Sequence, residues 1–264
     1  MVGGSVWRSC ASLMIIQVAT LNTIVHQCPP ECICLSHAQV LCNSGGLSEI
    51  PLKLLPPTVE QLSFKRNHFA VIRSDAFAGL RMLKKLSLDG NNISVIKPFA
   101  FRGLPRLKEL SIQHSPLPTL AQFAFAGLQN ITSIILSNNK IRLVECYCFA
   151  GTSNLKQIVL SNNPIMRIQA NAFSGLTNVE RLLLPSGIRI VEPDAFNGLE
   201  QVGFLKLAYM DLRTVASGTF RGTFSPVYVS IRIKVRVKFE NSRYDRNGTP
   251  KQLPTKSLRF MCKM

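Results

Sequence analysis

Hydrophobic positions recur along the chain with a period close to 24 residues. From Val59 onward, one eleven-residue phrase repeats, with apolar residues at its first, fourth, sixth and eleventh positions. The five clearest copies are VEQLSFKRNHF, LKKLSLDGNNI, LKELSIQHSPL, ITSIILSNNKI and LKQIVLSNNPI, and two weaker copies begin at Val179 and Val202. The alternation of apolar and polar residues inside the phrase predicts a short strand in every copy.

A phenylalanine follows the phrase at the same later position in every copy. These residues are Phe77, Phe101, Phe125, Phe149, Phe173, Phe196 and Phe220. A single copy cannot bury its apolar face alone, so the copies must stack on one another. We expect the phenylalanines to pack as a continuous core along the side opposite the strands, and this interpretation is favoured over a ligand site.

The ninth position of the phrase is asparagine in four copies: Asn67, Asn91, Asn139 and Asn163. An asparagine amide carries both donors and an acceptor, so it can bridge backbone groups that are buried at the turn after each strand. Ser115 stands there in the third copy and is expected to do part of this work, whereas Met210 in the seventh copy cannot. The sixth copy is one residue short near Pro185. The asparagine ladder should therefore weaken toward the C-terminus.

The first residues predict export. Arg8 is the only charged residue before Glu31, and an apolar stretch follows it from Cys10 to Leu21. This pattern is typical of a signal peptide within residues 1–27, cleaved somewhere before Cys28. The alternative is an unusual N-terminal strand. No other stretch approaches the roughly 18 apolar residues of a spanning helix, so we expect no membrane span in this chain.

Four cysteines cluster just after this segment: Cys28, Cys32, Cys34 and Cys42. An oxidising compartment favours disulfides, and the C-x-C spacing argues against the alternative of a zinc site. Farther along, Cys146 and Cys148 flank Tyr147. Cys148 is expected to be a buried thiol, because a C-x-C bridge would be strained. Cys146 would then be free to react or to pair between chains, with Cys262 as a further candidate.

Residues 28 to about 222 resemble the extracellular leucine-rich-repeat family with an N-terminal cysteine cap, the type of repeat found in Slit, the Nogo receptor and Toll-like receptors. The resemblance implies an α/β-type solenoid, a horseshoe with short parallel strands on its concave side and a mostly irregular convex side. It also implies that the cap is closed by Cys28–Cys34 and Cys32–Cys42. The predicted order is a signal peptide at 1–27, a cap at 28–58, seven repeats at 59–222 and an atypical basic tail at 223–264.

The family pattern breaks after Gly222, where another repeat or a cysteine-rich cap would be expected. Residues 227–239 instead alternate strictly between apolar and polar residues, which predicts a strand. Two compatible interpretations are a strand that covers the open end of the solenoid, and a truncated or alternatively spliced form. Residues 221–264 hold eleven Lys or Arg against Glu240 and Asp245. We expect the residues after Phe239 to be mobile, and the basic tail at 221–264 to bind heparin-like glycans weakly, with a solubilising end as the alternative.

Binding residues should point outward from the concave strands. The fifth position of the phrase changes along the chain from serine in the first three copies to Ile135, Val159 and Leu183. We therefore predict that a protein ligand binds the C-terminal half of this face. The predicted ligand-binding residues are Ile135, Val159, Arg181, Leu183, Phe204, Lys206 and Tyr209. The alternative is that Phe204 and Tyr209 only pack under the tail.

The composition and motifs of the chain limit the classes of partner and activity that we expect. The chain has 264 residues, 46% of them hydrophobic, and a formal charge of +17, which permits contact with anionic partners. No recognisable catalytic arrangement, phosphate-binding loop or metal motif occurs, so we expect no enzyme activity, cofactor or metal, and no nucleic-acid binding.

The sequence thus predicts a secreted module for recognition, adhesion or signalling, glycosylated at Asn92 and Asn130. The alternatives are a truncated or spliced form of a membrane-anchored receptor, and a structural matrix or glycosaminoglycan-binding protein.

Overall fold

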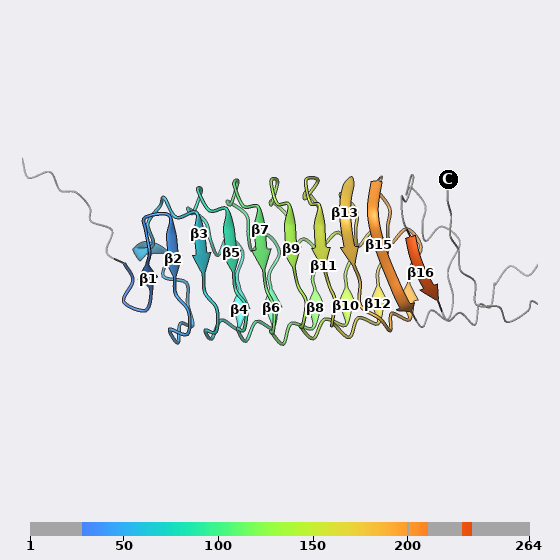
Figure 1. The fold of residues 1–264 in the computed structure, drawn as a ribbon, viewed down its shortest axis with the longest axis horizontal. Coiled ribbons are helices and arrows are strands. Elements are labelled where there is room, and N and C mark those ends of the chain that lie inside the picture. Colours follow the sequence, from blue (N-terminus) through green and yellow to red (C-terminus); the bar gives the residue numbers. More distant parts are fainter. Residues whose placement is uncertain (1–27, 200, 211–228, 234–264) are drawn as a thin grey trace, which may run out of the picture.

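The chain coils into a parallel β-solenoid in the computed structural model, which describes residues 28–199, 201–210 and 229–233 (Figure 1). Each repeat contributes one strand to a long sheet that runs along one wall of the coil. The repeat strands are β3 (Gln61–Ser63), β5 (Lys85–Ser87), β7 (Glu109–Ser111), β9 (Ser133–Ile135), β11 (Gln157–Val159), β13 (Asn178–Leu183) and β15 (Gln201–Met210). This arrangement confirms the predicted solenoid, and the wall that carries the sheet is the one expected to be concave.

Adjacent strands pair in parallel at equivalent positions of the repeat. Leu86 lies beside Leu110, and Ile134 lies beside Ile158. Because a strand alternates its side chains between two faces, the fourth position points into the core in every repeat, while the third and fifth positions point out. Equivalent residues of successive repeats therefore form straight columns along the sheet.

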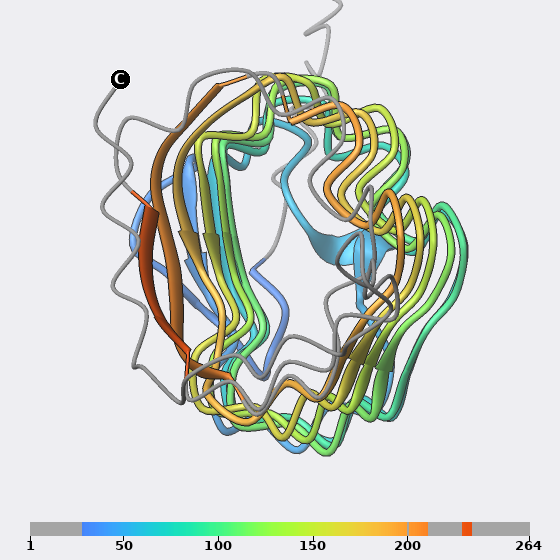
Figure 2. The same cartoon turned by 90° about the vertical axis from the view of Figure 1, so that its right-hand side faces the viewer.

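The opposite wall carries two short parallel sheets (Figure 2). One contains β4 (Val71–Ile72) and β6 (Val95–Ile96), and the other contains β8 (Thr119–Leu120), β10 (Leu143–Val144), β12 (Arg167–Ile168) and β14 (Ile190–Val191). Among the described residues the only helix is the 3-10 turn η1 (Leu52–Leu54). The convex side is thus more regular than the sequence suggested, and it is built from strands rather than helices.

The core is dominated by the phenylalanine column. Six of its members, from Phe77 to Phe196, have at most 1% of their surface exposed. Neighbouring rings are nearly parallel, with centroids 5.4 to 5.9 Å apart. The prediction of a continuous aromatic core is confirmed for these six, and Phe220 lies outside the described residues.

The asparagine ladder joins each coil to the one before it. The Asn139 amide nitrogen donates to the carbonyl of Ile112, at 2.7 Å, and to that of Leu136, at 2.9 Å, while its oxygen accepts from the Ser115 amide at 2.8 Å. Asn67, Asn91 and Asn163 make equivalent bonds.

The third copy is different. The hydroxyl of Ser115 is buried and has no hydrogen-bond partner, so the expectation that it does part of this work is wrong. The shorter serine side chain lies in the same column but makes none of the asparagine's side-chain bonds.

The N-terminal cap forms the two disulfides that the family resemblance implied, Cys28–Cys34 and Cys32–Cys42. They hold an antiparallel hairpin of β1 (Ile33–Cys34) and β2 (Gln39–Leu41), and β2 then pairs in parallel with β3. The cap thus covers the first coil and extends its sheet.

At the other end, β16 (Val229–Ile233) pairs in parallel with β15, with a shift in register between Ala208 and Met210. It is the described part of the strand expected over 227–239. The expected signal peptide at 1–27 and the basic tail beyond residue 233 lie outside the described residues. Within the described residues, no helix has the length and apolar character needed to cross a membrane.

The ladder predicts a large effect for Asn139→Ala. This substitution leaves buried carbonyls of two coils and one buried amide without their side-chain partner, so stability should fall by about 3 kcal/mol. Urea unfolding of the full chain, followed by circular dichroism, would measure this. Asn154→Ala is the matched control, because Asn154 makes a single exposed bond to the Gln129 carbonyl, and its loss should cost less than about 1 kcal/mol. Equal effects of the two substitutions would contradict the role given to the ladder.

Candidate functional site

The columns of outward-pointing residues on the long sheet form one continuous surface, which we call the sheet face. It comprises the third, fifth and seventh positions of successive repeats and their counterparts in the cap. The residues are Gln39, Leu41, Asn43, Gln61, Ser63, Lys65, Lys85, Ser87, Asp89, Glu109, Ser111, Gln113, Ser133, Ile135, Ser137, Gln157, Val159, Ser161, Arg181 and Leu183.

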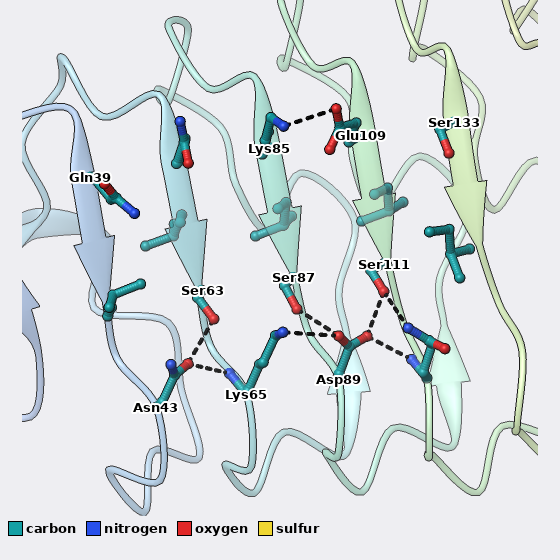
Figure 3. A pocket seen from close by; sticks show the side chains of 17 residues that line it. Gln39, Asn43, Ser63, Lys65, Lys85, Ser87, Asp89, Glu109, Ser111 and Ser133 are labelled. Carbon is teal, nitrogen blue, oxygen red and sulfur yellow. Dashed lines mark hydrogen bonds and ion pairs between the residues drawn. The ribbon is translucent and has the colours of Figure 1, made fainter.

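A shallow pocket of about 470 Å³ lies on the N-terminal half of the sheet face (Figure 3). It extends from β2 to β9, and Ile135 is the only predicted ligand-binding residue that lines it. This pocket was not predicted from the sequence. The signal was present in the repeated serines at the fifth position, which alternate with Asn43, Asp89 and Gln113 at the seventh.

Asp89 is the centre of a hydrogen-bond network in the pocket (Figure 3). Its carboxylate accepts from the Ser111 hydroxyl at 2.6 Å, the Ser87 hydroxyl at 2.9 Å and the backbone N–H of Gln113 at 3.0 Å, and it lies 3.6 Å from the Lys65 ammonium. Gln113 extends the network by accepting from the Ser137 hydroxyl at 2.8 Å. These bonds tie together side chains from neighbouring repeats, so the polar side chains are held in place before any partner binds.

Three lysines along this wall pair with a glutamate of an adjacent repeat. Lys84 pairs with Glu60, Lys85 with Glu109, and Lys156 with Glu180, at 2.7 to 3.0 Å. The hydrogen bond from Lys156 lowers the pKa of Glu180 below its ordinary value. Such exposed pairs add little stability, but each neutralises the charge of a lysine on this wall. Recognition on the sheet face therefore has to rest on shape and on specific side chains more than on net charge.

The C-terminal half of the sheet face holds the apolar column predicted from the sequence. Ile135 pairs directly with Val159, and Val159 with Leu183, on β9, β11 and β13. All three side chains are half-buried, so part of each surface is open. Their adjacency makes a single apolar stripe that begins at the edge of the pocket.

The other predicted ligand-binding residues follow the same register. Arg181 is exposed on β13, and its backbone pairs with that of Phe204, while Lys206 pairs with Leu183. Tyr209 lies in β15 at the shift in register. The structure thus brings six of the seven residues onto four adjacent strands in matching positions, and Tyr209 onto the last of these strands.

Cysteines outside the cap are reduced in the described part of the chain. Cys148 is fully buried, and burial raises the pKa of its thiol well above the ordinary value. Cys146 is a free thiol that is partly accessible. The prediction of a buried Cys148 thiol and no Cys146–Cys148 bridge is confirmed, and Cys262 lies outside the described residues. No group of metal-binding side chains occurs among the residues that the structure describes.

Two of the three sequons, those that begin at Asn92 and Asn130, lie outside the repeat strands, and both asparagines are exposed. The Asn130 amide donates to the Pro105 carbonyl at 2.9 Å, and the Thr132 hydroxyl of the same sequon donates to the Lys108 carbonyl at 2.9 Å. Occupancy of these sites by glycans stays a prediction.

Comparison with known proteins identifies the repeat. A family model described as "BspA type Leucine rich repeat region" matches residues 70–237 in six copies. The structure of human 5T4 (Wnt-activated inhibitory factor 1, trophoblast glycoprotein) is similar at 26% identity and a TM-score of 0.55, over 79% of this chain and 80% of that one. A structure of a TLR13–ssRNA13 complex has the same fold, with 24% identity and a TM-score of 0.57, over 79% of this chain and 28% of that one. Comparison with curated protein sequences gives no match.

The burial of Cys148 predicts selective thiol labelling. A maleimide added to the native protein should modify Cys146 readily, and Cys148 at least about 100-fold more slowly, because attack needs an exposed thiolate and hence an opening of the coil. Peptide mass spectrometry on the native and the urea-unfolded chain would resolve the two sites, with Cys146→Ser as the control. Equal labelling of both thiols, or a peptide in which they are joined, would show the assignment to be wrong.

Proposed function

Because the chain belongs to the BspA-type leucine-rich-repeat family, we propose that it is an extracellular recognition module that holds a protein partner on its sheet face. Binding, rather than catalysis, is the role that we propose for the chain. The disulfide cap supports an oxidising, extracellular setting, since such bonds rarely persist in the cytosol.

One observation carries the proposal: the stripe of Ile135, Val159 and Leu183 lies in register beside an ordered polar pocket. Burying partly open apolar side chains gives the hydrophobic gain of binding, and contiguous positions let one partner surface cover all three. The Asp89 network adds fixed polar groups at the edge, and groups already held in place lose less entropy when a partner binds. An apolar centre beside a polar border is the usual anatomy of a protein interface.

Arg181 extends this surface toward the C-terminus. It is exposed and makes no ion pair within the described residues, unlike Lys156, which directly precedes the neighbouring strand β11. The register then continues to Phe204 and Lys206 on β15, and Tyr209 lies farther along the same strand. Arginine and aromatic residues are enriched among those that dominate binding energy, so these residues are the proposed anchors at the C-terminal end of the stripe.

The same surface would serve either a secreted protein or the extracellular part of a membrane-anchored receptor. Human 5T4 is a glycoprotein by name, and it matches this chain over most of its length. Heparin-like glycans remain proposed as secondary partners of the basic tail, from charge alone.

Export predicts N-linked glycans at Asn92 and Asn130, since both are exposed and each begins a sequon. Protein secreted from eukaryotic cells should lose mass on treatment with a glycosidase, and Asn92→Gln and Asn130→Gln should each remove one glycan. Asn247 provides an internal comparison, because Pro250 follows its sequon and its occupancy should be low. A secreted chain whose mass did not change on treatment would count against the extracellular assignment.

The sheet-face proposal predicts that the double substitution Val159→Asp and Leu183→Asp abolishes partner binding. Placing two carboxylates in the apolar stripe should weaken affinity at least about 30-fold, which corresponds to the loss of one dominant contact. Partners would be recovered from extracellular extracts with the unmodified chain, purified, and titrated by calorimetry.

The matched control replaces exposed apolar residues on the opposite wall, Val71→Asp and Ile190→Asp, and should leave the affinity unchanged. Circular dichroism and thermal melting would check that both variants fold, and Val159→Gln with Leu183→Gln is a milder alternative if the aspartates destabilise the sheet. Undiminished binding by a folded sheet-face variant would overturn the proposal.

A further inference from the structure

A second set of stacked aromatic residues lies on the wall opposite the sheet face, and it is separate from the buried phenylalanine column. Phe99, Phe123 and Tyr147 occupy the same position in three consecutive repeats, two residues before the buried phenylalanine. Their ring centroids are 5.8 and 6.3 Å apart. Phe99 and Tyr147 are 38% and 37% exposed, so the edges of this stack face solvent. We call these three residues the aromatic ladder.

The three residues of the aromatic ladder have positive φ angles, a backbone conformation that asparagine, aspartate and glycine adopt more readily than aromatic residues do. Phe99, Phe123 and Tyr147 have φ values of 58°, 58° and 55°, in the left-handed region that bulky side chains disfavour. The flanking repeats fill the same position with Asp75, Asn171 and Asp194, which tolerate this conformation well. The core does not need the aromatic rings, because the buried phenylalanine of each repeat already fills it. Strain retained in three successive repeats therefore points to a use on the surface.

The patch around the aromatic ladder has defined ends. At one end the Arg102 guanidinium donates to both carboxylate oxygens of Asp75, at 2.6 and 2.7 Å, and lies 5.4 Å from the Phe99 ring centre. At the other end the Asn197 amide donates to Asn171 at 3.2 Å. Between these polar pairs, the positions equivalent to Arg102 and Asn197 are alanine in two repeats, Ala126 and Ala150. The aromatic rings thus lie between two polar side-chain pairs.

Opposite charges flank the two ends of the aromatic ladder in the same column. Lys97 and Glu145 each precede their aromatic residue by two positions, and the repeat between them has Ala121 there. Neither makes an ion pair within the described residues; Glu145 only accepts a hydrogen bond from the Gln122 amide at 3.0 Å. The patch is therefore positive at one end, apolar in the middle and negative at the other.

We propose that two copies of this chain pack their aromatic ladders against each other in an antiparallel, two-fold symmetric dimer centred on Phe123. A two-fold axis that lies in the interface, across the ladder at Phe123, reverses the order of the repeats in the second copy. It places Lys97 of each copy opposite Glu145 of the other, which gives two identical charge pairs at the ends of one aromatic contact. A patch that carries both signs around an apolar centre is complementary to itself, whereas a partner of a single charge would match one end only.

The dimer should be weak and dependent on concentration. Three ring edges and their alanine neighbours cover much less than the roughly 800 Å² per partner that stable interfaces bury. The two charge pairs then account for a large share of the specificity of the dimer. A test of the proposal should therefore change these charges.

The first test measures the self-association of the secreted full chain by sedimentation equilibrium, with Cys146 and Cys262 replaced by serine so that covalent dimers cannot form. A monomer–dimer equilibrium is expected, and Phe123→Asp should weaken it at least about tenfold. This variant should fold, because aspartate occupies the same position with the same φ in two flanking repeats. Ile190→Asp, an exposed apolar residue elsewhere on this wall, should have no effect. A chain that stays monomeric at all concentrations, or a dimer unaffected by Phe123→Asp, would overturn the proposal.

The second test reverses the charges. Lys97→Glu and Glu145→Lys should each weaken the homodimer, while an equimolar mixture of the two variants should form a heterodimer and the double variant should recover the homodimer. Only the antiparallel arrangement pairs these two residues across the interface, and recovery in the mixture shows that both variants are folded. Failure of the mixture to associate would exclude the proposed symmetry. The sheet-face variant with Val159→Asp and Leu183→Asp should still dimerise, so this inference and the proposed partner-binding surface can fail separately.

Discussion

The solenoid depends on supplying hydrogen-bond donors to backbone carbonyls that are buried at the turn after each strand. A single asparagine amide serves two coils at once: the Asn91 nitrogen donates to Phe64 of the preceding coil at 2.9 Å and to Leu88 of its own coil at 2.8 Å. An unpartnered buried carbonyl costs more free energy than a typical hydrogen bond gains. A shift of one coil relative to the next would break the bonds of the asparagine ladder, so these bonds fix the register between coils. Register in turn creates the columns from which the phenylalanine core, the sheet face and the aromatic ladder are all built.

Periodicity was enough to predict the fold and much of the core, because both follow from which positions repeat. The burial of Phe101 and the outward position of Val159 needed only the 24-residue spacing and strand alternation. The repeat spacing alone was not enough to predict the pocket. Asp89 accepts hydrogen bonds from groups in two repeats. The acceptor to which each serine hydroxyl donates depends on side-chain distances, which the 24-residue spacing does not encode. Ser115 shows the same limit, since its hydroxyl occupies the right column but has no partner. The strands of the opposite wall are only two residues long, too short to leave a pattern.

The two walls of the coil differ in how they use apolar side chains. On the sheet face, Ile135, Val159 and Leu183 are half-buried among their neighbours, and the polar residues beside them are largely bonded to one another. Apart from the cap and η1, the large hydrophobic residues with the most exposed surface lie on the opposite side instead: Val71, Val95, Phe99, Tyr147, Met166 and Ile190. Scattered residues of this kind are ordinary on a protein surface, and what separates the aromatic ladder from the rest is its register, its strained backbone and its charged ends.

If both surfaces act as proposed, their separation has a functional consequence. Each residue of the aromatic ladder comes three residues after a short strand of the wall opposite the sheet face, so a dimer formed through the ladders leaves both sheet faces open. Two open faces in one particle would let it engage two copies of a partner, and linked binding sites raise overall avidity without new contacts when both can be occupied together. A weak dimer suits this arrangement. It would assemble where the protein or its partner is concentrated, as on a surface, and partner binding would in turn favour the dimer, because linkage between two equilibria is reciprocal.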